Sequence, residues 1–193
     1  MNKEITIKNV RLSFSDNMVV SKAIGGGKPR WTCNLIFENN PTELKKVRDA
    51  IDEITKVEFA KGKPLGPDDI CLRDGNTNVN KEGEVYAGYV GNFFLSAARA
   101  DNGRQEPPLI VNGRLEPVRP GSVGYPQSGD YVNVKIEVYS QNGVNDKKND
   151  YGRKINCTFS VVQFVRKGES FGGGAAPSVA GLEPVEEDPT AEL

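Results

Sequence analysis

The sequence predicts a mainly β fold, and three observations support this prediction. Several segments alternate apolar and polar residues, which is the pattern of half-buried strands. One segment carries apolar residues at helical spacing, and the connecting segments are long, polar and rich in Gly and Pro. Five or more strands with one helix inserted midway are typical of an OB-fold-like Greek-key barrel. A β-sandwich fits the same pattern and stays open as an alternative.

The N-terminal part of the chain contains three predicted strands. The first spans Ile5–Phe14, and its alternation changes phase at Lys8-Asn9, which predicts a β-bulge. A second strand is expected around residues 18–24, before a glycine-rich tip that ends at Lys28. This tip lacks the residues of a phosphate-binding P-loop, so we interpret it as a hairpin tip whose lysine can still contact a phosphate backbone. The third strand spans residues 30–38, and its apolar face consists of Trp31, Cys33, Leu35 and Phe37.

One amphipathic helix is predicted after the third strand. Asn40 is a suitable N-cap, Pro41 fits the first helical position and Glu43 lies in the first turn. The apolar residues that follow at helical spacing are Leu44, Val47, Ile51 and Ile54. The helix is therefore expected to span about four turns and to end near Phe59.

Four further strands are predicted, at residues 90–99, 109–111, 130–140 and 153–166. The last two alternate cleanly, and the polar segment 141–152 between them is expected to be a mobile loop. Among the aromatic residues, the core positions of the predicted elements are assigned to Phe14, Phe37, Phe59 and Phe159.

Composition excludes several kinds of catalytic and metal site. None of the 193 residues is histidine, so a Ser-His-Asp or Cys-His nucleophile, a His-ligated zinc and an imidazole base are all excluded. Cys33, Cys71 and Cys157 are odd in number and form no CxxC motif, which argues against a disulfide framework or a metal knuckle. No carboxylates have a spacing that indicates a metal site. We therefore expect no catalytic residue, no metal and no cofactor, and interpret the chain as a binding protein rather than an enzyme.

The sequence also predicts where the protein resides. The three cysteines are interpreted as small apolar residues in a reducing compartment. The chain begins without an apolar leader, and no segment approaches the roughly 18 apolar residues that a membrane helix needs. A soluble, cytoplasmic protein without a membrane partner is therefore expected.

Charge is distributed unevenly along the chain. The formal net charge is −1, yet residues 169–193 hold six of the 26 acids and no Lys or Arg, which leaves residues 1–168 with 25 bases, 20 acids and a net charge of +5. Residues 172–181 have the composition of a flexible linker, and residues 182–193 are acidic and expected to be disordered. The sequence thus predicts a folded domain at 1–171 and a linker with an acidic tail at 172–193.

A basic body with exposed aromatic residues favours binding to single-stranded nucleic acid. Such binding requires cations for the phosphates and aromatic faces for unstacked bases. On residue type and strand face, the candidates for phosphate contact are Arg30, Arg99, Arg104, Lys135, Arg153 and Lys154. The candidates for base stacking are Tyr86, Tyr89, Phe94, Tyr131 and Tyr139. Packing within the protein is the alternative role for any one of these aromatic residues.

The order and spacing of several segments resemble those of a known family. The segments are Leu72-Arg73-Asp74-Gly75, Glu84-Val85-Tyr86-Ala87-Gly88-Tyr89, Phe93-Phe94-Leu95-Ser96-Ala97, Pro107-Pro108-Leu109-Ile110-Val111 and Tyr131-Val132-Asn133-Val134. Together they resemble the single-stranded DNA-binding proteins of tailed bacteriophages. The resemblance covers residues 5–171 and the character of the tail.

This resemblance implies an OB fold that binds displaced DNA strands during replication, recombination and repair. It also implies an acidic tail that recruits replication or recombination proteins, here through Glu186, Glu187, Asp188, Glu192 and Leu193. Tails of this type commonly end with an aromatic residue, whereas this chain ends with leucine. We expect the tail to compete with DNA for the basic groove and to weaken binding at low salt.

Other functions remain compatible with the sequence. A nuclease or recombination enzyme would need a metal ion, and magnesium-dependent degradation of DNA would favour it. A phage structural or adaptor β-barrel that binds no nucleic acid would share the strands and the missing histidine. RNA could replace DNA as the ligand, because stacking and phosphate contacts serve both. A homodimer through an edge strand or an exchanged tail is also possible.

Overall fold

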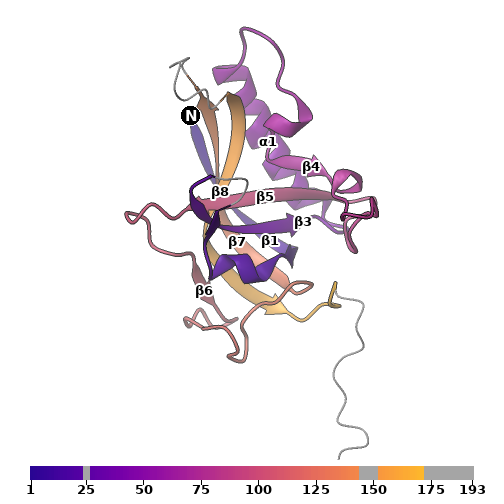
Figure 1. Ribbon diagram of the computed structural model, residues 1–193, viewed down its shortest axis with the longest axis vertical. Helices are drawn as coiled ribbons and strands as arrows, with labels where there is room; N and C mark the ends of the chain where they lie inside the picture. The colour runs from indigo at the N-terminus through magenta and orange to yellow at the C-terminus, as the bar shows by residue number, and fades with distance from the viewer. Residues whose placement is uncertain (24–26, 144–151, 172–193) are drawn as a thin grey trace, which may run out of the picture.

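Eight strands form one sheet that curls around an apolar core (Figure 1). The computed structural model describes residues 1–23, 27–143 and 152–171. The strands are β1 (Asn2–Ser13), β2 (Lys22–Ala23), β3 (Pro29–Ile36), β4 (Leu72–Asp74), β5 (Phe93–Ala100), β6 (Leu109–Val111), β7 (Tyr131–Asn142) and β8 (Arg153–Arg166). One helix, α1 (Pro41–Glu58), and three short 3-10 turns, η1 (Ser15–Met18), η2 (Pro67–Asp69) and η3 (Gly75–Thr77), complete the described elements. The mainly β fold with a single α-helix confirms the prediction.

The sheet closes into a barrel at the seam between β5 and β8. Strands follow one another in the order β4-β5-β3-β1-β7-β8-β6, and β2 pairs with β3. At the seam, the Cys71 N–H donates to the Ile155 carbonyl at 2.9 Å, and the Cys71 carbonyl accepts from the Ser96 N–H at 2.9 Å. One residue thereby bridges two strands that would otherwise leave open edges. Because β5 also contacts β8 at this seam, β1, β3, β5, β8 and β7 enclose the core as a five-stranded barrel of the Greek-key type.

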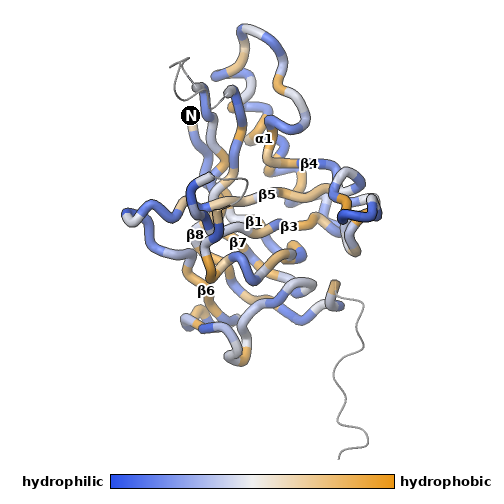
Figure 2. Tube along the Cα trace, viewed as in Figure 1, coloured by the Kyte–Doolittle hydropathy of each residue, from blue (hydrophilic) through white to orange (hydrophobic). Residues whose placement is uncertain are grey.

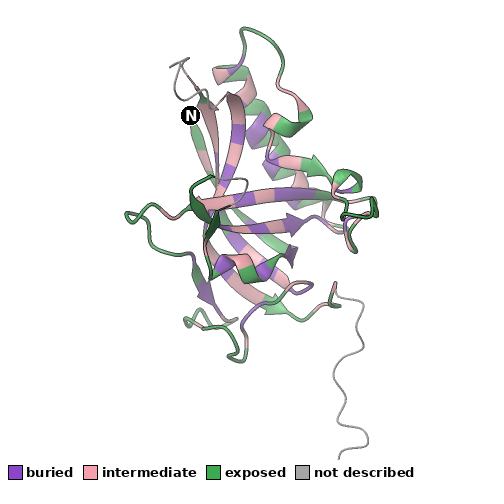
Figure 3. Ribbon diagram, in the orientation of Figure 1, coloured by how far each residue is buried: buried purple, intermediate pink, exposed green. Residues whose placement is uncertain are grey.

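The inward side chains of the barrel strands form the main core. Figure 3 shows buried positions alternating with partly exposed ones along these strands, and Figure 2 shows that the loops are largely hydrophilic. In β1, the register against β7 shifts between Ile7 and Val10, and both side chains are fully buried. The predicted bulge at Lys8-Asn9 is confirmed, because the extra residue lets both apolar residues face inward.

Helix α1 begins and packs as its sequence predicts. The Asn40 side chain accepts from the Glu43 N–H at 3.4 Å, and Pro41 lies in the first turn. Val47, Ile51 and Ile54 are buried, and the helix packs against β1 and β7. None of the described helices is long and apolar enough to cross a membrane.

Several expected boundaries differ from the structure. The strand expected at 18–24 is described as far as residue 23, and within that part only Lys22–Ala23 is a strand, because Met18 ends the η1 turn and is buried in the core. Strand β5 begins at Phe93 rather than residue 90, since the preceding residues form turns over the sheet. Phe14 was assigned to the core, but its side chain is 39% exposed because the chain turns away from the barrel after Ser13. Most of the predicted loop at 141–152 and the whole tail at 172–193 lie outside the described residues.

Candidate nucleic-acid interface

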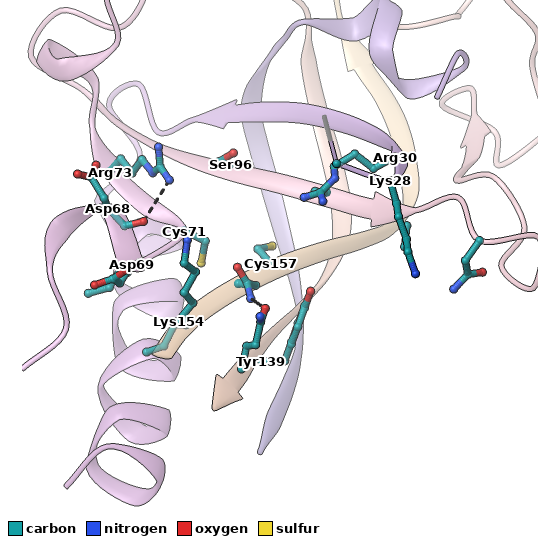
Figure 4. A pocket seen from close by; sticks show the side chains of 18 of the residues that line it. Lys28, Arg30, Asp68, Asp69, Cys71, Arg73, Ser96, Tyr139, Lys154 and Cys157 are labelled. Atoms are coloured by element: carbon teal, nitrogen blue, oxygen red, sulfur yellow. Dashed lines mark hydrogen bonds between the residues drawn. The ribbon is translucent and has the colours of Figure 1, made fainter. Parts of the chain in front are cut away.

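A groove of about 890 Å³ runs along the outer surface where β5 meets β8 and β7 (Figure 4). We call it the β5–β8 groove. On its β5 side it is lined by Ser96, Ala98 and Ala100, which are the small, outward-facing residues of that strand. Because these side chains are short, the strand leaves room for a ligand beside its backbone. Asn102, Gln141 and Asn156 add polar groups along the same groove.

Four cations from different parts of the chain line the β5–β8 groove. Lys28 and Arg30 lie at one end, whereas Arg73 of β4 and Lys154 of β8 lie nearer the other (Figure 4). Among the residues that the structure describes, none of the four forms an ion pair. The groove also contains the acids Asp68 and Asp69, so its lining has a formal net charge of +2. Cations without an acidic partner are suited to phosphate groups.

Tyr139 is the aromatic residue of the β5–β8 groove. It lies on β7 opposite Asn156 of β8, and its side chain lines the groove. Burial raises the pKa of the Tyr139 hydroxyl above its ordinary value, and the charge of Arg30 opposes that rise only in part. The hydroxyl therefore stays protonated at neutral pH and can donate a hydrogen bond. An aromatic ring beside Arg30 and Lys154 supplies the two kinds of contact that single strands require.

A second hollow, of about 600 Å³, lies on the outer surface of β1, β7 and β8. Its charged residues are Glu4, Arg99, Lys135 and Glu137, so its lining is electrically neutral in sum. Arg99 already donates from Nε to the Glu106 carbonyl at 2.7 Å, and Glu137 accepts from the Asn2 side chain. This balance of charge favours the β5–β8 groove over the second hollow as a phosphate site.

The sequence-predicted candidates fall into separate groups in the structure. Arg30, Lys154 and Tyr139 meet in the β5–β8 groove, whereas Arg99 and Lys135 lie in the second hollow. Arg104 is exposed in the segment that follows β5. The structure therefore brings together only part of the predicted set.

Arg153 and Tyr131 make internal contacts. Arg153 donates to the carbonyls of Lys61 and Lys63 and lies 5.1 Å from the centroid of the Phe59 ring. The Tyr131 hydroxyl donates to Glu38 at 2.7 Å, and the Arg166 guanidinium lies 3.3 Å from its ring centroid. These contacts give both side chains a role in holding neighbouring segments.

The structure corrects the predicted base-stacking role of Tyr89 and Phe94. Their side chains are only 1% and 4% exposed, and their ring centroids lie 5.0 Å apart in an edge-to-face arrangement. They form a small second core with Ile36, against which Val85 and Phe171 pack. A base cannot stack on a ring that the protein itself covers, so the interpretation of these two residues as base platforms is wrong. Tyr86 keeps an exposed fraction of 39%.

Sequence reasoning missed several residues of the β5–β8 groove. These are Arg73, Asn102 and the small β5 residues, all of which line it. One available signal was the alternation of residues 95–100, which puts small side chains on the outward face. In the register between β3 and β5, Arg30 pairs with Ala100, so a cation lies beside a strand face whose side chains are short. The position of Arg73 has no comparable signal, because it depends on the closure of the barrel at Cys71.

The thiols of Cys71 and Cys157, which lie near the β5–β8 groove, are unreactive because they are buried. Burial raises the pKa of the Cys71 thiol to about 12 and that of Cys157 well above its ordinary value. Both thiols are therefore protonated at neutral pH, and the thiolate is the form that attacks electrophiles or binds metals. Within the described part of the chain, no cluster of three or more His, Cys, Asp or Glu residues could hold a metal ion.

Comparison with known proteins identifies the family. The family model described as the ssDNA-binding protein of Enterobacter phage Enc34 matches residues 3–190. The chain belongs to this family. Among individual proteins, protein p50 of Acyrthosiphon pisum secondary endosymbiont phage 1 is similar to this chain, with 28% identity over 191 residues that cover 91% of this chain and 90% of p50.

Solved structures share the fold of this Enc34-type protein. The single-stranded DNA-binding protein of bacteriophage Enc34 in complex with ssDNA superimposes with a TM-score of 0.66 at 21% identity, covering 88% of this chain and 89% of that one. Gp2.5, a single-stranded DNA-binding protein of bacteriophage T7, gives a TM-score of 0.51 at 14% identity, covering 90% and 91% of the two chains. At these identities the likeness establishes the fold alone.

Proposed function

We propose that this chain binds single-stranded DNA in the β5–β8 groove with little preference for sequence. The observation that carries the proposal is the family match over residues 3–190, together with a groove that combines Tyr139 and four cations that form no ion pair with any described residue. Lys28, Arg30, Arg73 and Lys154 contact phosphates, and Tyr139 stacks against a base. Sequence preference is weak because phosphates and base faces are common to all sequences.

The geometry of the groove suits a single strand better than a duplex. The cations lie around the short side chains of β5 that line the groove. A DNA single strand that lies there has its phosphates near the cations and its bases near the barrel. In a duplex the base faces are already stacked on one another and cannot meet Tyr139. Arg99, Arg104 and Lys135 lie outside the groove and are proposed to guide the strand electrostatically as it enters or leaves.

We further propose a role in phage DNA replication, recombination and repair, within the cytoplasm of the host cell. Coating displaced strands would protect them until replication enzymes arrive. The acidic tail is proposed to recruit these enzymes through Glu186, Glu187, Asp188, Glu192 and Leu193, and to compete with DNA for the groove. The division into a binding domain at 1–171 and a tail at 172–193, and a homodimer, belong to the same proposal.

The contacts of residues 169–171, the last residues before the tail, support this division. Phe171 packs against the small core of Ile36, Tyr89 and Phe94, and the Arg11 guanidinium lies 4.3 Å from the centroid of its ring. Arg11 also donates to the Glu169 carbonyl at 2.7 Å. The last described residues are thus fixed to the barrel.

Fluorescence anisotropy tests the proposed function directly. A labelled oligo-dT and a duplex of equal length are titrated with the full chain and with a variant that ends at Phe171. We expect the single strand to bind more tightly than the duplex, and removal of the tail to tighten binding most at low salt. If neither protein binds the oligonucleotide at low salt, the proposal is overturned, and a structural or adaptor role takes its place.

A further inference from the structure

We propose that Phe14 and Tyr86 form a second base-stacking subsite, which a single strand reaches after crossing β5 and β3 from the β5–β8 groove. This inference rests on the proposed function and extends it to a part of the surface outside the groove. The two side chains are each 39% exposed, and their ring centroids lie 5.6 Å apart in an edge-to-face arrangement. Exposed aromatic faces are what an unstacked base requires.

A row of three polar residues on neighbouring strands lies between the groove and this aromatic pair. Ser96 lines the groove on β5 and pairs with the partly exposed Asn34 of β3, which in turn pairs with Ser13 of β1, a residue that is only 4% exposed. Phe14 follows Ser13 directly in the chain. Because neighbouring strands lie about 4.8 Å apart, the row spans about 10 Å from β5 to β1. The pair therefore lies close enough for the same strand to reach it.

Tyr89 joins the polar row to the aromatic pair. Its hydroxyl accepts a hydrogen bond from the Asn34 side chain at 2.9 Å, and its ring centroid lies 6.3 Å from that of Tyr86. Tyr89 is itself buried, so it supports the pair from within rather than contacting a ligand. This explains why an aromatic cluster extends from the core to the surface at this point.

The backbone holds Phe14 in an unusual conformation. Its φ of 58° and ψ of 43° are left-handed, a region that bulky side chains rarely adopt. The Ser15 N–H donates to Ser128 Oγ, and the Ser128 N–H donates to Ser15 Oγ, each at 3.0 Å. These paired bonds fix the turn, so a phenylalanine is kept exposed where glycine would be the less strained residue. The arrangement favours a binding role for the ring over a packing role.

The charge near the pair determines which part of the DNA it contacts. Asp16, two residues after Phe14, is exposed and acidic. A carboxylate repels a phosphate but does not prevent an uncharged base from stacking. We therefore assign a nucleobase, rather than the sugar-phosphate backbone, to this subsite.

Binding to oligo-dT of increasing length tests the inference. The variants are Phe14→Gly, which suits the left-handed backbone, and Tyr86→Leu, which keeps an apolar side chain. Lengths from about 4 to 16 nucleotides span the usual site sizes of one OB fold. Each variant should bind the shortest oligonucleotides like the wild type, and should lose about five- to a hundredfold in affinity for the longest ones.

Two matched variants separate the loss of the ring from a change in folding. Phe14→Tyr keeps an aromatic ring and should retain wild-type affinity at every length. Phe93→Leu removes another partly exposed aromatic residue, one that lies under Arg48 of α1, and should leave binding unchanged. Thermal unfolding of every variant confirms that the barrel remains folded.

The outcomes distinguish this inference from the proposed function. If the wild type binds, and if Phe14→Gly and Tyr86→Leu bind every length of oligonucleotide as tightly as the wild type does, the proposed subsite is overturned. Binding in the groove is not affected by this outcome. An equal loss at every length would also overturn it, because the pair would then not lie beyond the groove. A wild-type protein that binds no oligonucleotide overturns both proposals.

Discussion

Replacing two groove cations should reduce the salt dependence of single-strand binding by a defined amount. In the double variant Arg30→Gln/Lys154→Gln, two of the four cations that line the β5–β8 groove are neutral. Each phosphate contact contributes about 0.7 to the slope of log K against log salt, so four contacts give about −2.8 and two give about −1.4. Between about 50 and 200 mM salt, wild-type affinity should fall about fiftyfold and that of the variant about sevenfold.

The assay is anisotropy of a labelled oligo-dT at five or more salt concentrations. Lys45→Gln is the matched control, because Lys45 is exposed on α1, away from the groove, and pairs with Asp49. Its slope should equal that of the wild type. Phosphate contacts by Arg30 and Lys154 are refuted if the double variant keeps the wild-type slope, or if the control lowers the slope as much as the double variant does.

Three further predictions concern the stability of the barrel. Asp130→Ala removes a buried carboxylate that accepts hydrogen bonds from the Gln127 and Gly168 N–H groups and from Lys167. The free energy of unfolding should therefore fall by about 1–3 kcal/mol in urea titrations. A fall well under about 1 kcal/mol would contradict this role of Asp130. Because burial raises the pKa of Cys71 from 9.0 to about 12, the unfolded chain loses this proton first as the pH rises. The free energy of unfolding should therefore fall by up to about 1.4 kcal/mol per pH unit above pH 9 from this thiol, and Cys71→Ala should show a correspondingly weaker decline in urea titrations; an equal decline in both proteins would argue against it. Gly88→Ala should lower the melting temperature, because Gly88 has a φ of 82° and an added Cβ would overlap the Phe171 ring; an unchanged melting temperature would count against this packing.

The sequence predicts those features of the fold that depend on nearby residues. The bulge in β1 can be predicted from the sequence, because Ile7 and Val10 can both face inward only if one extra residue separates them. Helix α1 is visible because Asn40 and Pro41 mark its start and its apolar spacing continues for several turns. In each case the deciding contacts lie within one element or its immediate neighbours.

Part of the binding surface could not be predicted, because it depends on contacts between distant segments. Arg73 and Lys154 line the same groove only because Cys71 bonds to both β8 and β5. Residue type and strand face predict Tyr89 and Phe94 at the surface. The structure buries them because they pack on one another and on Ile36. Strand periodicity reports which face a residue occupies, but not what covers that face.

The proposed function places the DNA in the β5–β8 groove rather than in the second hollow. Photo-crosslinking of an oligo-dT that carries 5-iodouracil, followed by mass spectrometry of the peptides, locates the bases directly. We predict crosslinks at Tyr139 in the β5–β8 groove, which disappear in Tyr139→Leu. Crosslinks confined to the second hollow, around Lys135 and Arg99, would contradict binding in the β5–β8 groove.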